Sequence, residues 1–462
     1  GGKKPSQKII DKLIKSLRHR GPDGIGRYVS SDTALMQTRL AVIDLETGEQ
    51  PLTLQKRGSA GALALVANGE IYNYIELRLE LEERFRTQSD CEPALFLYEK
   101  NGLSYAEKLR GMYAIAIHDS EKNRLILSRD PFGIKPLYYC YTKSGFVFSS
   151  EFQAFIASGL VKPNISKKCE EELLQLQFNS GRETILKGIF RVLPGETIVI
   201  EGGKIKENRL LNRFSLSKKK KFDVKTAIKV LDKKLEKSVF LHQRADVPYG
   251  LFLSGGVDSS VLLAMMRRLN DKPVNTFTIG FSGGDAHDER SHARKIAQLS
   301  GANHDEIDFD ENDFWNLLPE IVNFMDEPSA DYAILPTFKL ASSVKAAGLK
   351  VVLSGEGADE IFAGYGRYRR ALRPRIFGGR MPRSFGILSD LGIICDDSKE
   401  WKQGNSLERE KSSEITKLQY LQCIDFDDWL PNDLLNKLDR CLMAHGIEGR
   451  VPFLDSDLAN FA

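Results

Sequence analysis

The segment Leu253-Ser254-Gly255-Gly256-Val257-Asp258-Ser259-Ser260 has the pattern of a phosphate-binding loop. It follows a short apolar run at 249–253 and precedes helical spacing at 260–269, so we expect a strand, a loop and a helix in that order. The two glycines allow a sharp turn that brings backbone N–H groups close to an anion, and the start of the helix adds a partial positive charge. The segment therefore predicts a site for phosphate groups.

Asp258 distinguishes this loop from the lysine-containing Walker type. Because a carboxylate repels phosphate oxygens unless a cation lies between them, Asp258 indicates a site for Mg²⁺. A plain glycine turn with an Asp or Ser helix cap is the alternative, and it would be preferred for a shorter motif. The full segment, set between an apolar strand and a helix, favours the phosphate loop.

The rest of the C-terminal half alternates between strands and helices. Apolar spacing predicts helices at 224–241, 290–301 and 313–324, and strands at 276–281 and 350–353. Strands that alternate with helices predict a parallel sheet with helices on both faces, an α/β fold. Ligands of such sheets bind at the carboxyl ends of the strands.

A second polar loop follows the strand expected at 350–353: Leu353-Ser354-Gly355-Glu356-Gly357-Ala358-Asp359-Glu360. Its glycines permit close backbone approach, and Glu356 and Asp359 are placed to meet a metal ion or a developing positive charge. Three acidic residues in one segment would alone indicate a solvated helix cap. Because adjacent parallel strands end at the same sheet edge, two such loops favour one shared site.

The N-terminal half predicts a different, α+β layered fold. Short β-prone runs at 34–44, 62–67, 112–118 and 125–128 are separated by turns, and helical spacing occurs at 75–85 and 92–101. The order is not the regular strand–helix–strand of a nucleotide fold. Residues 202–222 are rich in Lys, Asn and Ser, which favours a solvated linker over a nucleic-acid patch. We therefore expect one domain at 1–205, a linker at 206–222 and a second domain at 223–462.

Composition excludes several classes of protein. The 462 residues carry 66 basic and 63 acidic side chains, a net charge of +3, which does not point to a nucleic-acid partner. We see no apolar stretch long enough to span a bilayer, and residues 1–15 lack the apolar core of a signal peptide. The six cysteines and seven histidines form no metal or redox motif. We expect a cytoplasmic protein without membrane or nucleic-acid partners.

The two polar loops resemble motifs of known enzymes. Segment 254–260 resembles the signature of the ATP pyrophosphatase (PP-loop) enzymes, and segment 353–360 resembles the SGEGxDE motif of glutamine-hydrolysing asparagine synthetases. Segments 326–331, 362–365 and 444–455 match the same family in order and spacing. The resemblance implies ATP and Mg²⁺ as cofactors and aspartyl-adenylate formation at Glu356. It assigns metal binding to Asp258 and Asp359, and ATP binding to Leu253, Ser254, Gly255, Gly256, Asp258, Ser259, Ile279, Ser354 and Gly355.

The N-terminal half resembles class II glutamine amidotransferase domains, which have an N-terminal nucleophile hydrolase-like fold. The matching segments are 20–23, 39–44, 48–52, 68–73, 89–90 and 129–133. By this resemblance the side chain of Asn68 and the N–H of Gly69 form an oxyanion hole, and Arg39 meets the glutamine carboxylate. Asp90 and Glu70 meet the glutamine ammonium. The implied glutamine-binding set is Arg39, Leu40, Ala41, Val42, Ile43, Asn68, Gly69, Glu70 and Asp90.

The family's nucleophile is a cysteine that directly follows the initiator methionine, whereas this sequence begins at Gly1. Cys91 is internal and has no free α-amine to act as the base, so it is not expected to replace that nucleophile. We expect that residues precede Gly1 in the full protein, and that further helices follow Ala462.

Together these features predict ATP-dependent synthesis of L-asparagine from L-aspartate. Ammonia would come from glutamine, and the reaction would pass through β-aspartyl-AMP and release AMP, pyrophosphate and glutamate. The small-molecule substrates are then glutamine, aspartate and ATP, and a homodimer is compatible with the resemblance. Alternatives are a related amidotransferase or β-lactam-forming synthetase with another carboxylate substrate, a tRNA-modifying PP-loop enzyme, and a non-catalytic interaction protein.

Overall fold

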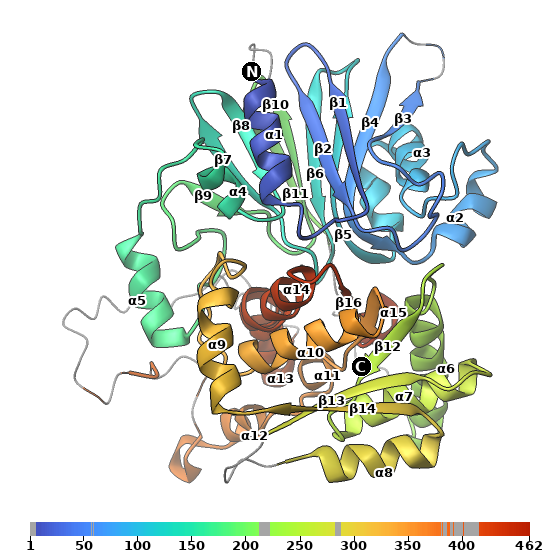
Figure 1. Cartoon of the computed structure of the whole chain (residues 1–462), viewed down its shortest axis with the longest axis vertical. Helices are drawn as coiled ribbons and strands as arrows, with labels where there is room; N and C mark the ends of the chain where they lie inside the picture. Colours follow the sequence, from blue (N-terminus) through green and yellow to red (C-terminus); the bar gives the residue numbers. More distant parts are fainter. Residues whose placement is uncertain are drawn as a thin grey trace. The chain divides into compact units, whose positions relative to one another are not determined.

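The computed structural model describes residues 6–56, 58, 60–211, 222–281, 288–379, 381, 386–388, 391, 401 and 415–462. The chain forms two compact units (Figure 1). The first comprises Gly1–Ser166 and Gly181–Arg213, and the second comprises Lys167–Ser180 and Phe214–Ala462. Of the linker expected at 206–222, residues 206–210 belong to strand β11 (Lys204–Leu210), and the lysine run at 218–221 lies outside the described residues.

The first unit is built on a six-stranded antiparallel sheet in the order β11-β10-β6-β5-β4-β3. Its other strands are β3 (Leu52–Gln55), β4 (Ala62–Ile71), β5 (Gly111–Asp119), β6 (Arg124–Arg129) and β10 (Glu196–Glu201). A three-stranded sheet β8-β7-β9 and a hairpin β1–β2 complete it. Their bounds are β1 (Gly24–Val29), β2 (Ala34–Arg39), β7 (Tyr138–Thr142), β8 (Gly145–Ser149) and β9 (Ile189–Arg191).

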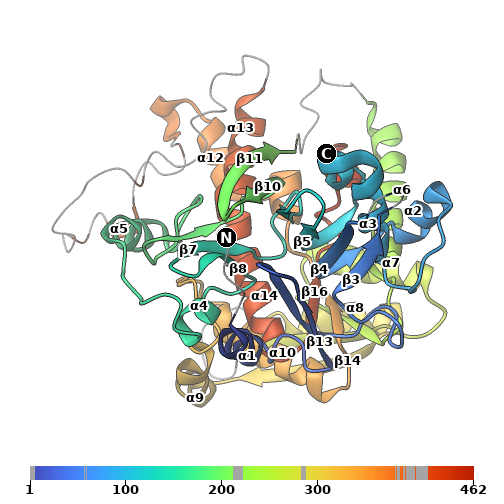
Figure 2. The same ribbon diagram turned by 90° about the horizontal axis from the view of Figure 1, so that it is seen from above.

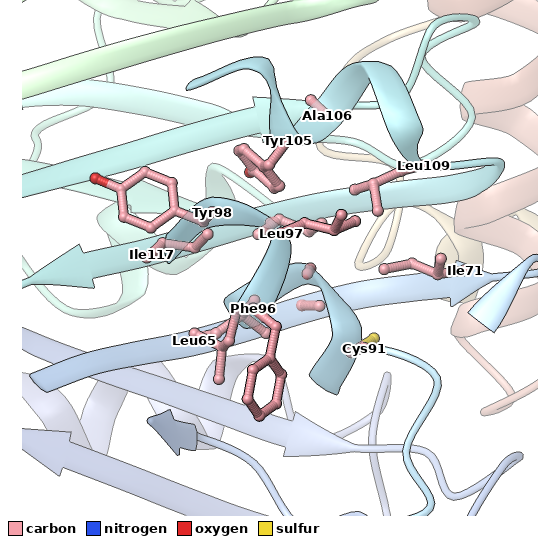
Figure 3. Close-up of a cluster of buried hydrophobic side chains, with 14 of the residues drawn as sticks. Leu65, Ile71, Cys91, Phe96, Leu97, Tyr98, Tyr105, Ala106, Leu109 and Ile117 are labelled. Atoms are coloured by element: carbon pink, nitrogen blue, oxygen red, sulfur yellow. The ribbon is translucent and has the colours of Figure 1, made fainter. Parts of the chain in front are cut away.

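Strand β4 shows why this unit is layered. Its alternate residues Leu63, Leu65 and Ala67 belong to one buried cluster, and Ala64 and Val66 belong to another. Because successive side chains of a strand point to opposite faces, β4 contributes to a core on each side of the sheet. Figure 3 shows the first cluster, where Phe96, Leu97 and Tyr98 lie against the strands.

The helices of the first unit are α1 (Gln7–Ser16), α2 (Tyr74–Leu81), α3 (Glu92–Asn101), η1 (Gly102–Lys108) and α4 (Gln153–Ala157). Helix α3 supplies Phe96 and Tyr98 to the cluster in Figure 3, and η1 supplies Tyr105. Helix α1 packs beside α4 and against β2 (Figures 1 and 2). The expected helix at 92–101 and the strands at 112–118 and 125–128 are confirmed. The strand expected at 34–44 ends at Arg39, where a loop begins.

The second unit contains a five-stranded parallel sheet in the order β14-β13-β12-β15-β16. The strands are β12 (Tyr249–Phe252), β13 (Asn275–Phe281), β14 (Asn303–Phe309), β15 (Val351–Leu353) and β16 (Glu448–Arg450). From β12 the chain first adds β13 and β14 on one side, and later adds β15 and β16 on the other. The order thus reverses between β12 and β15, the position at which ligands bind in open α/β sheets.

Helices cover both faces of this sheet, as predicted. Helices α8 (Arg290–Ser300) and α10 (Ile334–Ala346) both pack on β13 and β14, and they lie on opposite sides of these strands (Figure 1). The remaining helices are α5 (Lys167–Leu176), α6 (Val224–His242), α7 (Val257–Leu269), α9 (Glu311–Ile321), α11 (Ala358–Phe362), α12 (Gly366–Leu372), η2 (Arg375–Phe377), α13 (Lys417–Ile424), the π-helix η6 (Asp425–Leu434), α14 (Leu435–Met443) and α15 (Ser456–Ala459). In the part of the chain that the structure describes, no helix combines the length and the apolar character needed to span a membrane.

Candidate active sites in the two units

The two glycine-containing loops of the second unit meet at the point where the strand order reverses. Strands β12 and β15 pair in parallel, with Leu251 opposite Leu353, so the loops that follow them leave the sheet at the same edge. A Cβ atom added to Gly355 would lie 3.4 Å from the Cβ of Asp258 and 3.5 Å from the backbone nitrogen of Ser259. The second loop therefore packs directly on the first, as the sequence predicts.

The first loop is held by its own serines. The Oγ atoms of Ser254 and Ser259 lie 3.1 Å apart, and the N–H of Ser254 donates to Ser259 Oγ at 3.2 Å. Gly255 has a φ of +81°, a backbone conformation that side chains rarely adopt. Helix α7 begins with Gly256 as its N-cap, and no side chain caps it. The alternative of an Asp or Ser cap is thus not realised, and the amides of the first turn are suited to an anion.

Asp258 and Asp359 lie close enough at this edge to influence each other's charge. Burial, and after it repulsion from Asp359, raises the pKa of Asp258. Burial also raises the pKa of Asp359, against the attraction of the Arg367 guanidinium. A Cβ at Gly364 would lie 1.9 Å from Asp359 Oδ1, so glycine at 364 leaves room for that carboxylate. Two half-buried carboxylates of raised pKa are a pair that a cation would stabilise.

The residues fit one mode of Mg²⁺ binding. Among the residues that the structure describes, no group of three or more His, Cys, Asp or Glu side chains could enclose a metal ion. Mg²⁺, however, commonly keeps several waters and binds through one or two carboxylates together with substrate phosphates. Asp258 and Asp359, beside the uncapped start of α7, match that donor set.

Leu253 and Ile279, both expected to bind ATP, lie at the end of β12 and on the neighbouring strand β13. Leu253 donates its N–H to the Phe277 carbonyl at 2.9 Å, and its carbonyl accepts from Thr278 Oγ1. Ile279 lies two residues further along β13, opposite Ile307. Since both backbone groups of Leu253 are bonded within the sheet, a nucleotide could use only the second lone pair of its carbonyl.

Glu356, in the second loop, has a neighbour that sequence reasoning missed. The Nζ atom of Lys437, on α14, lies 3.8 Å from Glu356 Oε1 and donates to Asp331 Oδ2 at 2.7 Å. Asp331 belongs to the 326–331 segment that resembles the synthetase family, which was a usable signal. Lys437 itself gave no sequence signal of a functional role, because it lies in a helix whose residues are all buried.

Residues of the family segments 362–365 and 444–455 contact the second loop. Gly357 has a φ of +89°, and a Cβ there would lie 2.4 Å from Leu454 Cδ2. The Ser354 N–H donates to the Arg450 carbonyl at 2.8 Å, which extends the pairing of β15 with β16. The Tyr365 hydroxyl donates to Glu360 Oε1 at 2.8 Å. These contacts fix the second loop against its surroundings.

In the first unit, Asn68 and Gly69 lie within strand β4 instead of forming a hairpin turn. Gly69 pairs with Tyr113 of β5 and has a φ of +125°. A Cβ at this position would lie 2.0 Å from the Met112 carbonyl oxygen, so only glycine fits. The Asn68 side chain donates to Ser150 Oγ at 3.3 Å. The strand thus positions the residues expected to form the oxyanion hole.

Asp90 is brought against the same strand. Asp90 and Glu70 are both buried, and Asp90 Oδ2 accepts the N–H of Ile71 at 2.7 Å. Cys91 is also buried, and its Sγ lies 3.4 Å from Asp90 Oδ2 (Figure 3 shows this sulfur at the start of α3). Because Asp90 accepts from Ile71, and Glu70 directly precedes Ile71, the two carboxylates expected to meet the glutamine ammonium both lie at this end of β4.

The loop after β2 orients Arg39. Its Nη2 donates to the carbonyls of Ile43 and Asp44, and a Cβ at Gly48 would lie 2.5 Å from that nitrogen. The Ala41 N–H donates to Asp23 Oδ2 at 2.8 Å. Leu40 is half-buried within this loop, and its neighbours Ala41, Val42 and Ile43 are buried. Arg39 is thus presented by a folded loop.

Asp44 is a positioning residue that the sequence did not single out. It has a φ of +55° and accepts from the N–H groups of Thr47 and Gln88, both at 2.8 Å. Burial would raise the pKa of Asp44, but hydrogen bonds from the Thr47 hydroxyl and from these two N–H groups lower it below its usual value. Because Gln88 precedes Ser89 and Asp90, the charged Asp44 ties the Arg39 loop to the turn that carries Asp90.

Comparison with known proteins gives a consistent result for both units. Residues 230–462 match the asparagine synthase family model, and residues 1–211 match the model of the glutamine amidotransferase domain. Glutamine-hydrolyzing asparagine synthetase 1 of Bacillus subtilis (strain 168) is 32% identical, over 97% of this chain and 76% of that protein. This chain belongs to the asparagine synthase family. Asparagine synthetase B of Escherichia coli (strain K12) is 29% identical over 97% of the chain and 70% of its own length.

The chain is therefore a ligase of the asparagine synthase family, and the resemblance seen in its motifs is confirmed. Its first unit has the amidotransferase fold, and its parallel sheet is that of an ATP pyrophosphatase-type domain, as predicted. The relatives also include a protein named amidase chyE from Penicillium rubens, 32% identical over 79% of the chain and 56% of that protein. Names within the family thus differ.

Proposed function

We propose that this chain makes L-asparagine from L-aspartate, ATP and ammonia taken from glutamine. The observation that carries the proposal is the packing of Gly355 on Asp258, which places two polar loops at one sheet edge. Relatives named glutamine-hydrolyzing asparagine synthetase support the choice of aspartate and glutamine. The reaction would run in the cytoplasm through β-aspartyl-AMP and release AMP, pyrophosphate and glutamate.

In the second unit, the proposed chemistry is activation of a carboxylate. A carboxylate is a poor electrophile, and attachment of AMP provides a good leaving group for attack by ammonia. Ser254, Ser259 and the first-turn amides of α7 would hold the pyrophosphate portion of ATP. Asp258 and Asp359 would hold Mg²⁺, which when bound neutralises phosphate charge. Glu356 would face the acceptor during adenylation.

In the first unit, the proposed chemistry is hydrolysis of the glutamine side-chain amide. Arg39 would bind the glutamine carboxylate through paired hydrogen bonds, and the buried Asp90 and Glu70 would bind its ammonium. Asn68 and Gly69 would stabilise the oxyanion of the tetrahedral intermediate. We propose that each activity belongs to one unit, with the sequence boundary near residues 206–222.

The test is product analysis of the purified protein with aspartate, ATP and Mg²⁺, supplied either with glutamine or with ammonium. Ammonium bypasses the first unit, so this arm examines the second unit alone. We expect asparagine, AMP and pyrophosphate in equal amounts. Absence of asparagine and AMP in the ammonium arm, with folded protein that binds ATP, would overturn the proposal.

A second candidate keeps the ATP chemistry and changes the acceptor. It is favoured by the relative named amidase chyE. In that case a different carboxylate, offered in a panel, would stimulate AMP release while aspartate would not. The same assay therefore separates the two candidates.

A further inference from the structure

Lys437 is a buried cation beside the proposed ATP site, and the function proposed above gives it no role. It lies on α14, a helix in which every residue from Leu435 to Met443 is buried. Its side chain is only 7% exposed. Because removing an ammonium group from water is costly unless it is paired, the position of Lys437 depends on its partners.

Those partners are three carboxylates from separate segments. Lys437 Nζ donates to Asp331 Oδ2 at 2.7 Å and lies 3.8 Å from Glu356 Oε1. Asp433, one helical turn earlier in the chain, adds a third negative charge and accepts from Ser329 Oγ. Although burial would lower the pKa of Lys437, these charges raise it above its usual value. The lysine is thus cationic at neutral pH.

The two contacts of the ammonium differ in a way that suggests its role. The bond to Asp331 is short and anchors the ammonium. The separation from Glu356 is too long for a hydrogen bond, so it attracts that carboxylate without using its lone pairs. Glu356 is 25% exposed and can still accept from another donor. Lys437 therefore attracts the Glu356 carboxylate and leaves its oxygens available.

We propose that Lys437 is a positioning residue for Glu356, whose carboxylate it directs toward the acceptor during adenylation, with Asp331 as its anchor. This inference rests on the function proposed above, and specifically on the role of Glu356. A purely structural role predicts that loss of Lys437 lowers stability and all activities together. A positioning role predicts that adenylation is lost while ATP binding is kept.

The test compares Lys437→Met and Lys437→Arg with a matched control, Lys339→Met. Lys339 forms an ion pair with Asp313, at 2.5 Å, elsewhere in the same unit, so its loss measures the general effect of removing a half-buried pair. The first readout is aspartate-dependent AMP release with ammonium, and the second is ATP affinity by calorimetry. For Lys437→Met we expect kcat to fall by about tenfold or more, with ATP affinity within about twofold of the parent. Lys437→Arg should recover part of the rate, and Lys339→Met should behave as the parent.

A third readout does not depend on the acceptor. Carbodiimide couples to carboxyl groups that it can reach, so the labelling of Glu356, followed by peptide mass spectrometry, reports how firmly its carboxylate is held. We expect faster labelling of Glu356 in Lys437→Met and parental labelling in Lys339→Met. Parental labelling and rate in Lys437→Met, or loss of ATP binding in step with the rate, would overturn the inference. If the parent releases AMP with no aspartate dependence, the proposed function fails instead, and the labelling result still decides the role of Lys437.

Discussion

Gly355 lies against Asp258, and this contact joins the two loops at the sheet edge. An added Cβ at 355 would lie 3.4 Å from the Cβ of Asp258, which is ordinary van der Waals contact. A methyl group therefore fits, but a larger side chain has to displace one loop. The distance makes residue 355 a direct probe of how closely the loops must pack for ATP to bind.

We predict that Gly355→Val weakens ATP binding by about tenfold or more, because overpacking shifts the loop that carries Asp258. Gly355→Ala should bind ATP nearly as the parent does. Calorimetry with ATP·Mg²⁺ measures both, and thermal unfolding checks that each variant is folded. Equal binding by the valine and alanine variants would show that the contact is not required.

Gly69 provides a test of the first unit. Gly69→Ala places a Cβ 2.0 Å from the Met112 carbonyl oxygen at a φ of +125°, so we expect a loss of about 2–4 kcal/mol in unfolding free energy. Gly159→Ala is the matched control, since Gly159 has a φ of +79° with no atom within 4 Å. It should lose only about 1 kcal/mol from backbone strain. Urea unfolding followed by circular dichroism compares them, and equal losses would contradict the steric explanation.

The fold of the second unit was accessible from sequence because its signals are local. The apolar run at 249–253, the glycine pair and the helical spacing after them predict a strand, a loop and a helix, and β12 and α7 follow that order. The helix begins at Val257, three residues earlier than expected, because Gly256 serves as its N-cap. The sequence also predicted that the two polar loops share one sheet edge, and the parallel pairing of β12 with β15 places them there.

Other features could not be predicted from the local sequence pattern. Strand β14 alternates exposed charged residues with partly buried ones at the edge of the sheet, so it lacks an apolar run. Helix α14 has polar and apolar residues at helical spacing, yet it is buried on all sides, so the burial of Lys437 and Arg440 could not be read from that pattern. Asn68 and Gly69 have the composition of a turn, yet β4 continues through them because β5 pairs with them. In each case tertiary contacts outweigh the local pattern.

Asp433 predicts a dependence of stability on pH. Burial raises the pKa of Asp433 to about 6, although Ser329 donates to it and Lys437 attracts its charge. A carboxyl group with a folded-state pKa above its unfolded value of 3.8 stabilises the fold at low pH. That contribution is lost as pH rises from about 4 through about 6.

Asp433→Asn removes this titration and keeps an oxygen that can accept from Ser329. Relative to the parent, the variant should therefore gain stability as pH rises, by an amount on the order of 1–3 kcal/mol between pH 4 and 7. Urea unfolding at several pH values measures the difference between the two proteins. A difference that stays constant over this range would contradict the assigned pKa direction.

Arg39 allows the two activities to be separated. Because its guanidinium is held by the carbonyls of Ile43 and Asp44, its position depends on the loop and not on the ligand. Arg39→Lys keeps the charge but loses the paired geometry, so glutamine affinity should fall by about tenfold or more. Ammonium-dependent AMP release by the same variant should equal that of the parent. Asp44→Asn should also weaken glutamine binding, to a smaller degree, because it removes charge from the group that links this loop to Gln88. Calorimetry with glutamine measures both variants, and a parallel fall in ammonium-dependent activity would mean that the substitutions disturb the whole chain instead of the glutamine site.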